Sequence, residues 1–123
     1  MKIVTTTVGN YCIGSLLTLM CIFPLSVEAK TLYVDGTTGN DTITYNSNSS
    51  STPWRTIGRA AWGSTNRNAP NTTEAAQAGD TVIVASGTYS TVGTDDRFGV
   101  AYLPANSGTS GNPITFQAQG TVV

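Results

Sequence analysis

The strands that this sequence predicts are short, and no tight-turn signal joins one of them to the next. Residues that favour β-structure gather in four runs separated by turns rich in Gly, Asn, Ser and Thr: Thr31–Val34, Thr81–Ala85, Val100–Leu103 and Ile114–Ala118. A two-residue turn of the Asn-Gly type, which marks a hairpin, is missing between Val84 and Val100 and between Leu103 and Ile114. Short strands joined by broad polar turns favour coils of a parallel β-solenoid. The alternative, a small antiparallel β-sandwich, needs more strands than these.

Alternation within the runs predicts which side chains face inward. In Thr81–Ala85 the two valines point to one face and Ile83 to the other. In the last run, three residues share the inward face, which we expect to be left uncovered: Ile114, Phe116 and Ala118. Gly120 is expected to break this strand.

Two short helical segments lie between the first and second predicted strands. Thr52 and Pro53 are typical of a helix start, so we predict a helix over Arg55–Trp62 that Gly63 ends. Its apolar stripe consists of Ile57, Ala60 and Ala61. The second segment, one or two turns over Thr72–Ala78, follows from a spacing like that of a capping box, with Asn71 before Glu74.

The first 29 residues are predicted to be a signal peptide. Cys12 to Phe23 is an apolar run of the length found in such leaders, and it is short for a membrane span. Val27 and Ala29 are small residues at the positions that a signal peptidase reads, which predicts cleavage after Ala29. The mature domain then begins at Lys30, and we expect it to be exported without stable membrane insertion. The alternative is that the run remains as an uncleaved anchor.

Composition excludes several kinds of site from the mature segment. The chain has two cysteines, Cys12 and Cys21, both in the predicted leader, and it has no histidine. A disulfide framework, a Cys- or His-based zinc site and a Ser-His-Asp triad are therefore excluded from Lys30–Val123. The formal net charge of −1 gives no electrostatic reason to expect nucleic acid as a partner.

Four blocks of residues, in this order, carry a resemblance to a known family. They are YVDGTTGNDT at 33–42, PWRTIGRAA at 53–61, AGDTVIVASGTY at 78–89 and SGTSGNPITFQAQG at 107–120. In them the sequence resembles the N-terminal region of secreted proteins with the right-handed parallel β-helix fold, the pectin-lyase-like superfamily. The resemblance covers nearly all of the mature chain. One departure is the connection 62–77, which is longer than usual and puts the local topology there in doubt.

The resemblance implies a mainly β fold made of an N-terminal cap with a short α-helix and about one coil of a solenoid. Because neighbouring coils must stack to bury a continuous core, we expect residues 30–123 to be the start of a longer domain. The parent protein is then expected to act on extracellular polysaccharide as a lyase or glycosidase. The alternatives are a surface or adhesive solenoid without catalysis and an inert truncated product.

Several residues are candidates for chemistry, although none is assigned a catalytic, cofactor-binding or metal-binding role. Asp35, Asn40 and Asp41 offer oxygen ligands for calcium, and Asx-turns are the alternative reading of the same residues. Calcium remains possible in the parent. The pair Asp95 and Asp96, followed by Arg97, is expected to be a solvated loop tip.

Basic and aromatic side chains near the predicted helix are a second group of candidates. Lyases of this fold use a Lys or Arg base, which draws attention to three cations: Arg55, Arg59 and Arg67. Arg55 and Arg59 are spaced i, i+4, so we expect both on a solvated helix face. Trp54 and Trp62 are suited to stacking on sugar rings, but packing of the cap is the expected role. Three triplets match glycosylation sequons, beginning at Asn40, Asn48 and Asn71.

Overall fold

The computed structural model describes residues 28–89 and 103–123, and its regular structure is mainly β. The elements in chain order are β1 (Thr31–Val34), α1 (Ile57–Trp62), the 3-10 helix η1 (Thr72–Glu74), β2 (Thr81–Gly87) and β3 (Thr115–Val122). All but two residues of the predicted leader lie outside the described ranges. So do the first three residues of the strand predicted at Val100–Leu103, and Leu103 itself is in no strand. In the described ranges no helix is long and apolar enough to cross a membrane.

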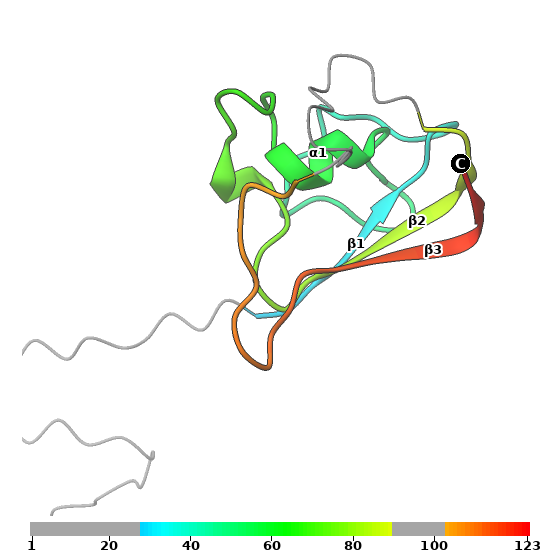
Figure 1. The fold of residues 1–123 in the computed structure, drawn as a ribbon. Helices are drawn as coiled ribbons and strands as arrows, with labels where there is room; N and C mark the ends of the chain where they lie inside the picture. The colour runs from blue at the N-terminus through cyan, green and yellow to red at the C-terminus, as the bar shows by residue number, and fades with distance from the viewer. Residues whose placement is uncertain (1–27, 90–102) are drawn as a thin grey trace, which may run out of the picture.

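The three strands form one parallel sheet in the order β1-β2-β3 (Figure 1). The parallel arrangement that the sequence favoured is therefore confirmed for these three strands. The register aligns the strands in rows, of which two are Leu32–Val82–Phe116 and Val34–Val84–Ala118. Parallel neighbours need a crossover connection between them, and between β1 and β2 the long polar segment that contains α1 and η1 supplies it.

One face of the sheet carries the core. Leu32, Val34, Val82 and Val84 are buried on it, as the alternation predicted for β2, and Trp54 packs with them as the largest fully buried side chain. The row positions continue into β3, where Phe116 lies on the same face but is 37% exposed. The core is thus closed over β1 and β2 and open over β3.

Helix α1 lies on this core face of the sheet (Figure 1), and its predicted apolar stripe is confirmed. Ala60 and Ala61 are fully buried, and Ile57 packs against the core cluster. The predicted end is also confirmed, since the Gly63 N–H donates to the Arg59 carbonyl at 3.0 Å and Gly63 has a φ of 76°.

The predicted start of α1 was two residues early. Thr56, rather than Thr52, is the N-cap, and its hydroxyl accepts a hydrogen bond from the Arg59 N–H at 3.1 Å. The Thr52 hydroxyl instead donates to the Ser47 carbonyl. Residues 52–54 run alongside β1, where Trp54 forms a bridge to Val34, and this tertiary pairing is why the chain enters the helix later.

Two further predicted boundaries were wrong. The helix expected over Thr72–Ala78 is only the single 3-10 turn η1, and the Asn71 side chain does not cap it. Gly120 does not end the last strand, because β3 continues to Val122. The register shifts between Ala85 and Gly87, and Gly120 takes a φ of 91° opposite this irregularity. A glycine in a bulged parallel pair therefore continues the strand.

Candidate functional site

The edge of β1 that faces away from β2 is covered by residues from the loop that follows this strand. The Asn48 amide bonds both backbone groups of Tyr33, its Oδ1 accepting from the N–H at 2.7 Å and its Nδ2 donating to the carbonyl at 3.0 Å. Trp54 adds a backbone bond to the same carbonyl, and the Asp35 N–H donates to the Trp54 carbonyl at 2.8 Å. These bonds occupy the groups that a further strand would need for pairing.

The opposite edge of the sheet is open. β3 has only β2 as a neighbour in the described part of the chain, and all of its residues except Val122 are exposed. Beside it is a cavity of about 400 Å³ between α1 and the core face of the sheet. Its lining is mainly apolar and consists of Ile57, Val84, Pro104, Phe116, Gln117, Ala118 and Val122. An open strand edge beside an apolar cavity is the place where another element can pack.

Arg59 is enclosed beneath the loop that covers β1, so the expectation that it lies on a solvated face was wrong. It is 3% exposed, and its Nη2 forms an ion pair with Glu74 Oε2 at 2.7 Å. The guanidinium also donates to the carbonyls of Asp41, Ile43 and Glu74. It lies 4.4 Å from the ring of Trp54, in a cation–π arrangement. Five rigid donors allow one side chain to join all of these groups.

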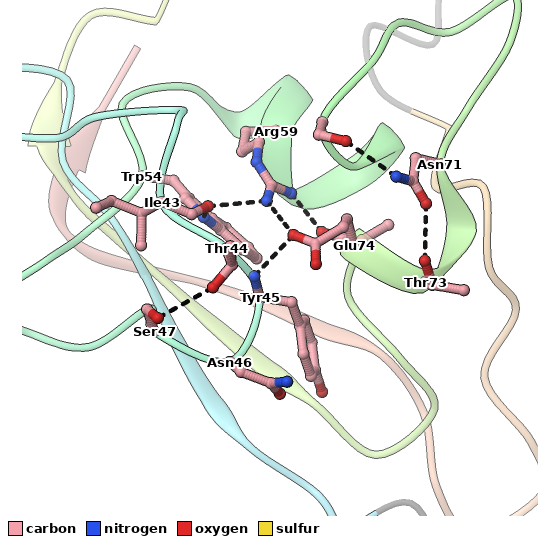
Figure 2. Close-up of polar contacts among 12 residues, drawn as sticks. Ile43, Thr44, Tyr45, Asn46, Ser47, Trp54, Arg59, Asn71, Thr73 and Glu74 are labelled. Carbon is pink, nitrogen blue, oxygen red and sulfur yellow. Dashed lines mark hydrogen bonds and ion pairs between the residues drawn. The ribbon is translucent and has the colours of Figure 1, made fainter.

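Glu74 serves this network and not the expected capping box. In Figure 2 its carboxylate lies between the Arg59 guanidinium and the backbone of Tyr45. Oε2 accepts from Arg59 Nη2 and from the Tyr45 N–H, the latter at 2.8 Å. Asn71 instead accepts a hydrogen bond from the Thr73 hydroxyl. The ion pair therefore attaches the loop of residues 41–45 to both α1 and η1.

Another acid, Asp80, lies directly before β2. It is fully buried, and it accepts hydrogen bonds from the Tyr45 hydroxyl, the Gln77 N–H and the Lys30 N–H, each at 2.8 Å. Burial and the neighbouring Asp80 carboxylate raise the pKa of Tyr45 well above its ordinary value. Sequence reasoning missed both Asp80 and Tyr45. A signal was present, because a single acid directly before an apolar strand must find donors.

Two of the three candidate calcium ligands, Asp35 and Asn40, are engaged in the turn chemistry that was the alternative reading of these residues. Asp35 accepts from the N–H groups of Thr37 and Thr38 and from the Thr38 hydroxyl. These bonds, the hydroxyl first, lower the pKa of the Asp35 carboxyl. Asn40 Oδ1 accepts from the Thr42 N–H and hydroxyl.

Asp41, the third of these candidates, holds the start of α1. Its carboxylate accepts from the N–H groups of Arg55 and Thr56 and from the Thr56 hydroxyl. In residues 28–89 and 103–123, no cluster of three or more His, Cys, Asp or Glu side chains is arranged to hold a metal ion.

The aromatic and basic candidates are not gathered on one surface. Trp54 is fully buried and donates to the Ile43 carbonyl at 2.8 Å, which is the packing role expected of it. Trp62 is half-buried and donates to the Leu103 carbonyl at 3.0 Å. Arg55 is exposed and Arg67 is half-buried, while Arg59 points into the core. The pair Asp95 and Asp96 lies outside the described residues, as does Arg97.

The three sequons differ in accessibility. The nitrogen of Asn48 is committed to the edge of β1, and the side chain is only 5% exposed, so a glycan there would disrupt the edge. Asn40 is exposed and Asn71 is half-buried.

Comparison of the chain with known protein families, with curated proteins and with solved structures gives no match.

Proposed function

We propose that residues 30–123 are the N-terminal cap and first coil of an exported protein with a right-handed parallel β-helix fold. The observation that carries the proposal is the asymmetry of the sheet. Asn48 and Trp54 close the edge at β1, whereas the edge at β3 is open. The first coil of a solenoid needs a closed outer edge and an open edge toward the next coil, because each coil pairs only with its neighbours.

The cavity beside β3 supports the same proposal. Phe116 and Ala118 continue the inward rows that begin at Leu32 and Val34, yet neither is covered as those residues are. Apolar side chains of a further coil would fill the cavity and complete these rows. Burial of this kind contributes roughly 25 cal/mol for each Å² of apolar surface removed from water.

For the parent protein we propose action on extracellular polysaccharide, as a lyase or glycosidase. This rests on the resemblance of the four sequence blocks to pectin-lyase-like proteins, which is a likeness of fold. The second candidate is a surface or adhesive solenoid without catalysis. It is favoured by the carboxylates of Asp35, Asp41, Glu74 and Asp80, which are all engaged in structural hydrogen bonds.

The experiment starts from the exported protein, isolated from its producing cells with an antibody to residues 30–123. It is incubated with neutral and with acidic polysaccharides, and new reducing ends and unsaturated sugars are measured. New reducing ends without unsaturation indicate a glycosidase, and unsaturated products indicate a lyase. Retention on insoluble polysaccharide without cleavage supports the adhesive role. Neither cleavage nor retention on any polysaccharide would contradict the proposed substrate class.

A further inference from the structure

Asp80 is a buried carboxylate without a cationic partner. Its side chain is 0% exposed and has three donors, all formally neutral: the Tyr45 hydroxyl and the N–H groups of Gln77 and Lys30. Within the described residues the only ion pair is that of Arg59 with Glu74. Buried charges in proteins are as a rule paired, so Asp80 is an exception that requires an explanation.

One of the three donors lies at the predicted cleavage point. The Lys30 N–H belongs to the peptide bond between Ala29 and Lys30, and it lies 2.8 Å from Asp80 Oδ1. When a leader peptidase hydrolyses this bond with water, the Ala29 carbonyl becomes a carboxylate. The Lys30 nitrogen becomes an α-ammonium group, which carries a positive charge below its pKa of about 8.

We propose that Asp80 is the binding site for the processed N-terminus of this protein. Cleavage after Ala29 converts a neutral hydrogen bond into a buried ion pair between the Lys30 α-ammonium and Asp80. The inference rests on the export proposed above, and it adds that leader removal itself stabilises the fold. Charge-assisted hydrogen bonds are shorter and about twice as strong as neutral ones.

The contacts of Lys30 hold its nitrogen in place for this pairing. Its carbonyl accepts from the Thr81 N–H at 2.9 Å, which joins the entry of β1 to β2. Its Nζ donates to the Tyr45 carbonyl at 2.9 Å and lies 4.6 Å from the centre of the Tyr45 ring. The Tyr45 hydroxyl in turn donates to Asp80. Lys30 is therefore held through both its backbone carbonyl and its side chain. The α-ammonium group forms within hydrogen-bond distance of Asp80.

The test is selective acetylation of the exported protein at its N-terminus. Mass spectrometry first establishes that the mature chain begins at Lys30. In urea at near-neutral pH, where the fold and its ion pair are lost, an acetylating reagent modifies the α-amine, because lysine side chains remain protonated up to a pKa of about 10.4. The urea is then removed, and protein taken through the same steps without reagent is the reference. Acetylation restores a neutral amide N–H at the Lys30 nitrogen. We expect the thermal midpoint to fall by about 4 °C or more, and the amides of Leu32 and Val34 to exchange faster.

The matched control is Asp80→Asn, which keeps the shape of the side chain and removes its charge. Acetylation is expected to leave the midpoint of this variant unchanged. If Asp80→Asn does not fold, Tyr45→Phe replaces it, because loss of one neutral donor makes Asp80 depend more on the α-ammonium and enlarges the effect of acetylation. An unchanged midpoint after acetylation of the unmutated protein would overturn this inference and leave the export proposal standing. A mature chain that begins elsewhere overturns this inference together with the predicted cleavage after Ala29, and it likewise leaves export standing.

Discussion

At the scale of single residues, Arg59 connects parts of the chain that the sequence separates. Its guanidinium joins the loop carbonyls of Asp41 and Ile43 to Glu74 on η1. The i, i+4 spacing with Arg55 indicated a solvated face, because spacing describes only the helix itself. The acceptors that draw Arg59 inward come from residues 15 to 18 positions away. Local pattern therefore cannot predict such a network.

Replacing Arg59 by Met is expected to lower the free energy of unfolding by about 2–4 kcal/mol. The variant keeps most of the side-chain volume but removes the cationic partner of Glu74 and the donor to the Asp41 carbonyl. Arg55→Met is the matched control, since Arg55 is exposed, and it should change stability by less than about 0.5 kcal/mol. Urea unfolding of the two variant proteins measures both. Equal losses from the two variants would contradict the network.

The raised pKa of Tyr45 predicts how the free energy of unfolding changes at alkaline pH. Because its pKa is raised in the folded state, its contribution is fully present below the unfolded value of about 10 and is lost as pH rises above it. Tyr45→Phe should remove this part of the alkaline decline, at a cost of about 1–2 kcal/mol at neutral pH for the hydrogen bond to Asp80. Urea unfolding from about pH 8 to pH 11 tests the prediction. An alkaline decline that is identical in both proteins would refute it.

At the scale of the elements, the sequence predicted the three strands of the sheet. Period-two alternation is a local property, and it placed Val82 and Val84 on one face of β2, which is buried. Burial itself needs a covering layer, and the corresponding face of β3 is exposed. The boundaries depend on tertiary contacts, and there prediction failed. Pairing with β1 delays the start of α1. Glu74 pairs with Arg59 and does not form the expected capping box, because a buried cation is a stronger partner than a backbone N–H.

Substitution of Gly120 tests how tightly β2 and β3 pack at the irregular end of the sheet. A Cβ added there would lie 2.1 Å from the hydroxyl of Ser86, and its φ of 91° strains any other residue. Gly111 is a matched control, since it has a φ of 82° but no atom within 4 Å of an added Cβ. We expect Gly111→Ala to cost about 1 kcal/mol from backbone strain and Gly120→Ala about 2–4 kcal/mol, because overpacking is added.

Thermal or urea unfolding of both variants gives the comparison. Adding Ser86→Ala to Gly120→Ala should recover part of the difference, because it removes the atom that the new methyl group meets. Equal costs at Gly111 and Gly120, or no recovery from Ser86→Ala, would show that the close approach to Ser86 is not important for β3.

At the scale of the whole molecule, the arrangement is a sheet with one closed and one open edge. The sequence predicted parallel strands, because hairpin signals are missing between them. It did not predict how the edge of β1 is closed, since Asn48 lies in a polar loop where the local sequence indicates only a turn residue or a glycosylation sequon. The open edge at β3 could be anticipated in outline from the exposed face of Phe116. Its cavity depends on Pro104 and Ile57, which only the folded chain brings together.

The central claim is that a further strand pairs with the open edge of β3, and amide hydrogen exchange of the whole protein tests it most directly. The Thr115 N–H donates toward β2, to the Asp80 carbonyl. Because backbone groups alternate along a strand, the N–H groups of Phe116 and Ala118 point away from β2. The account predicts that these two amides are protected as strongly as those within β2. Rapid exchange at Phe116 and Ala118, with β2 still protected, would contradict it.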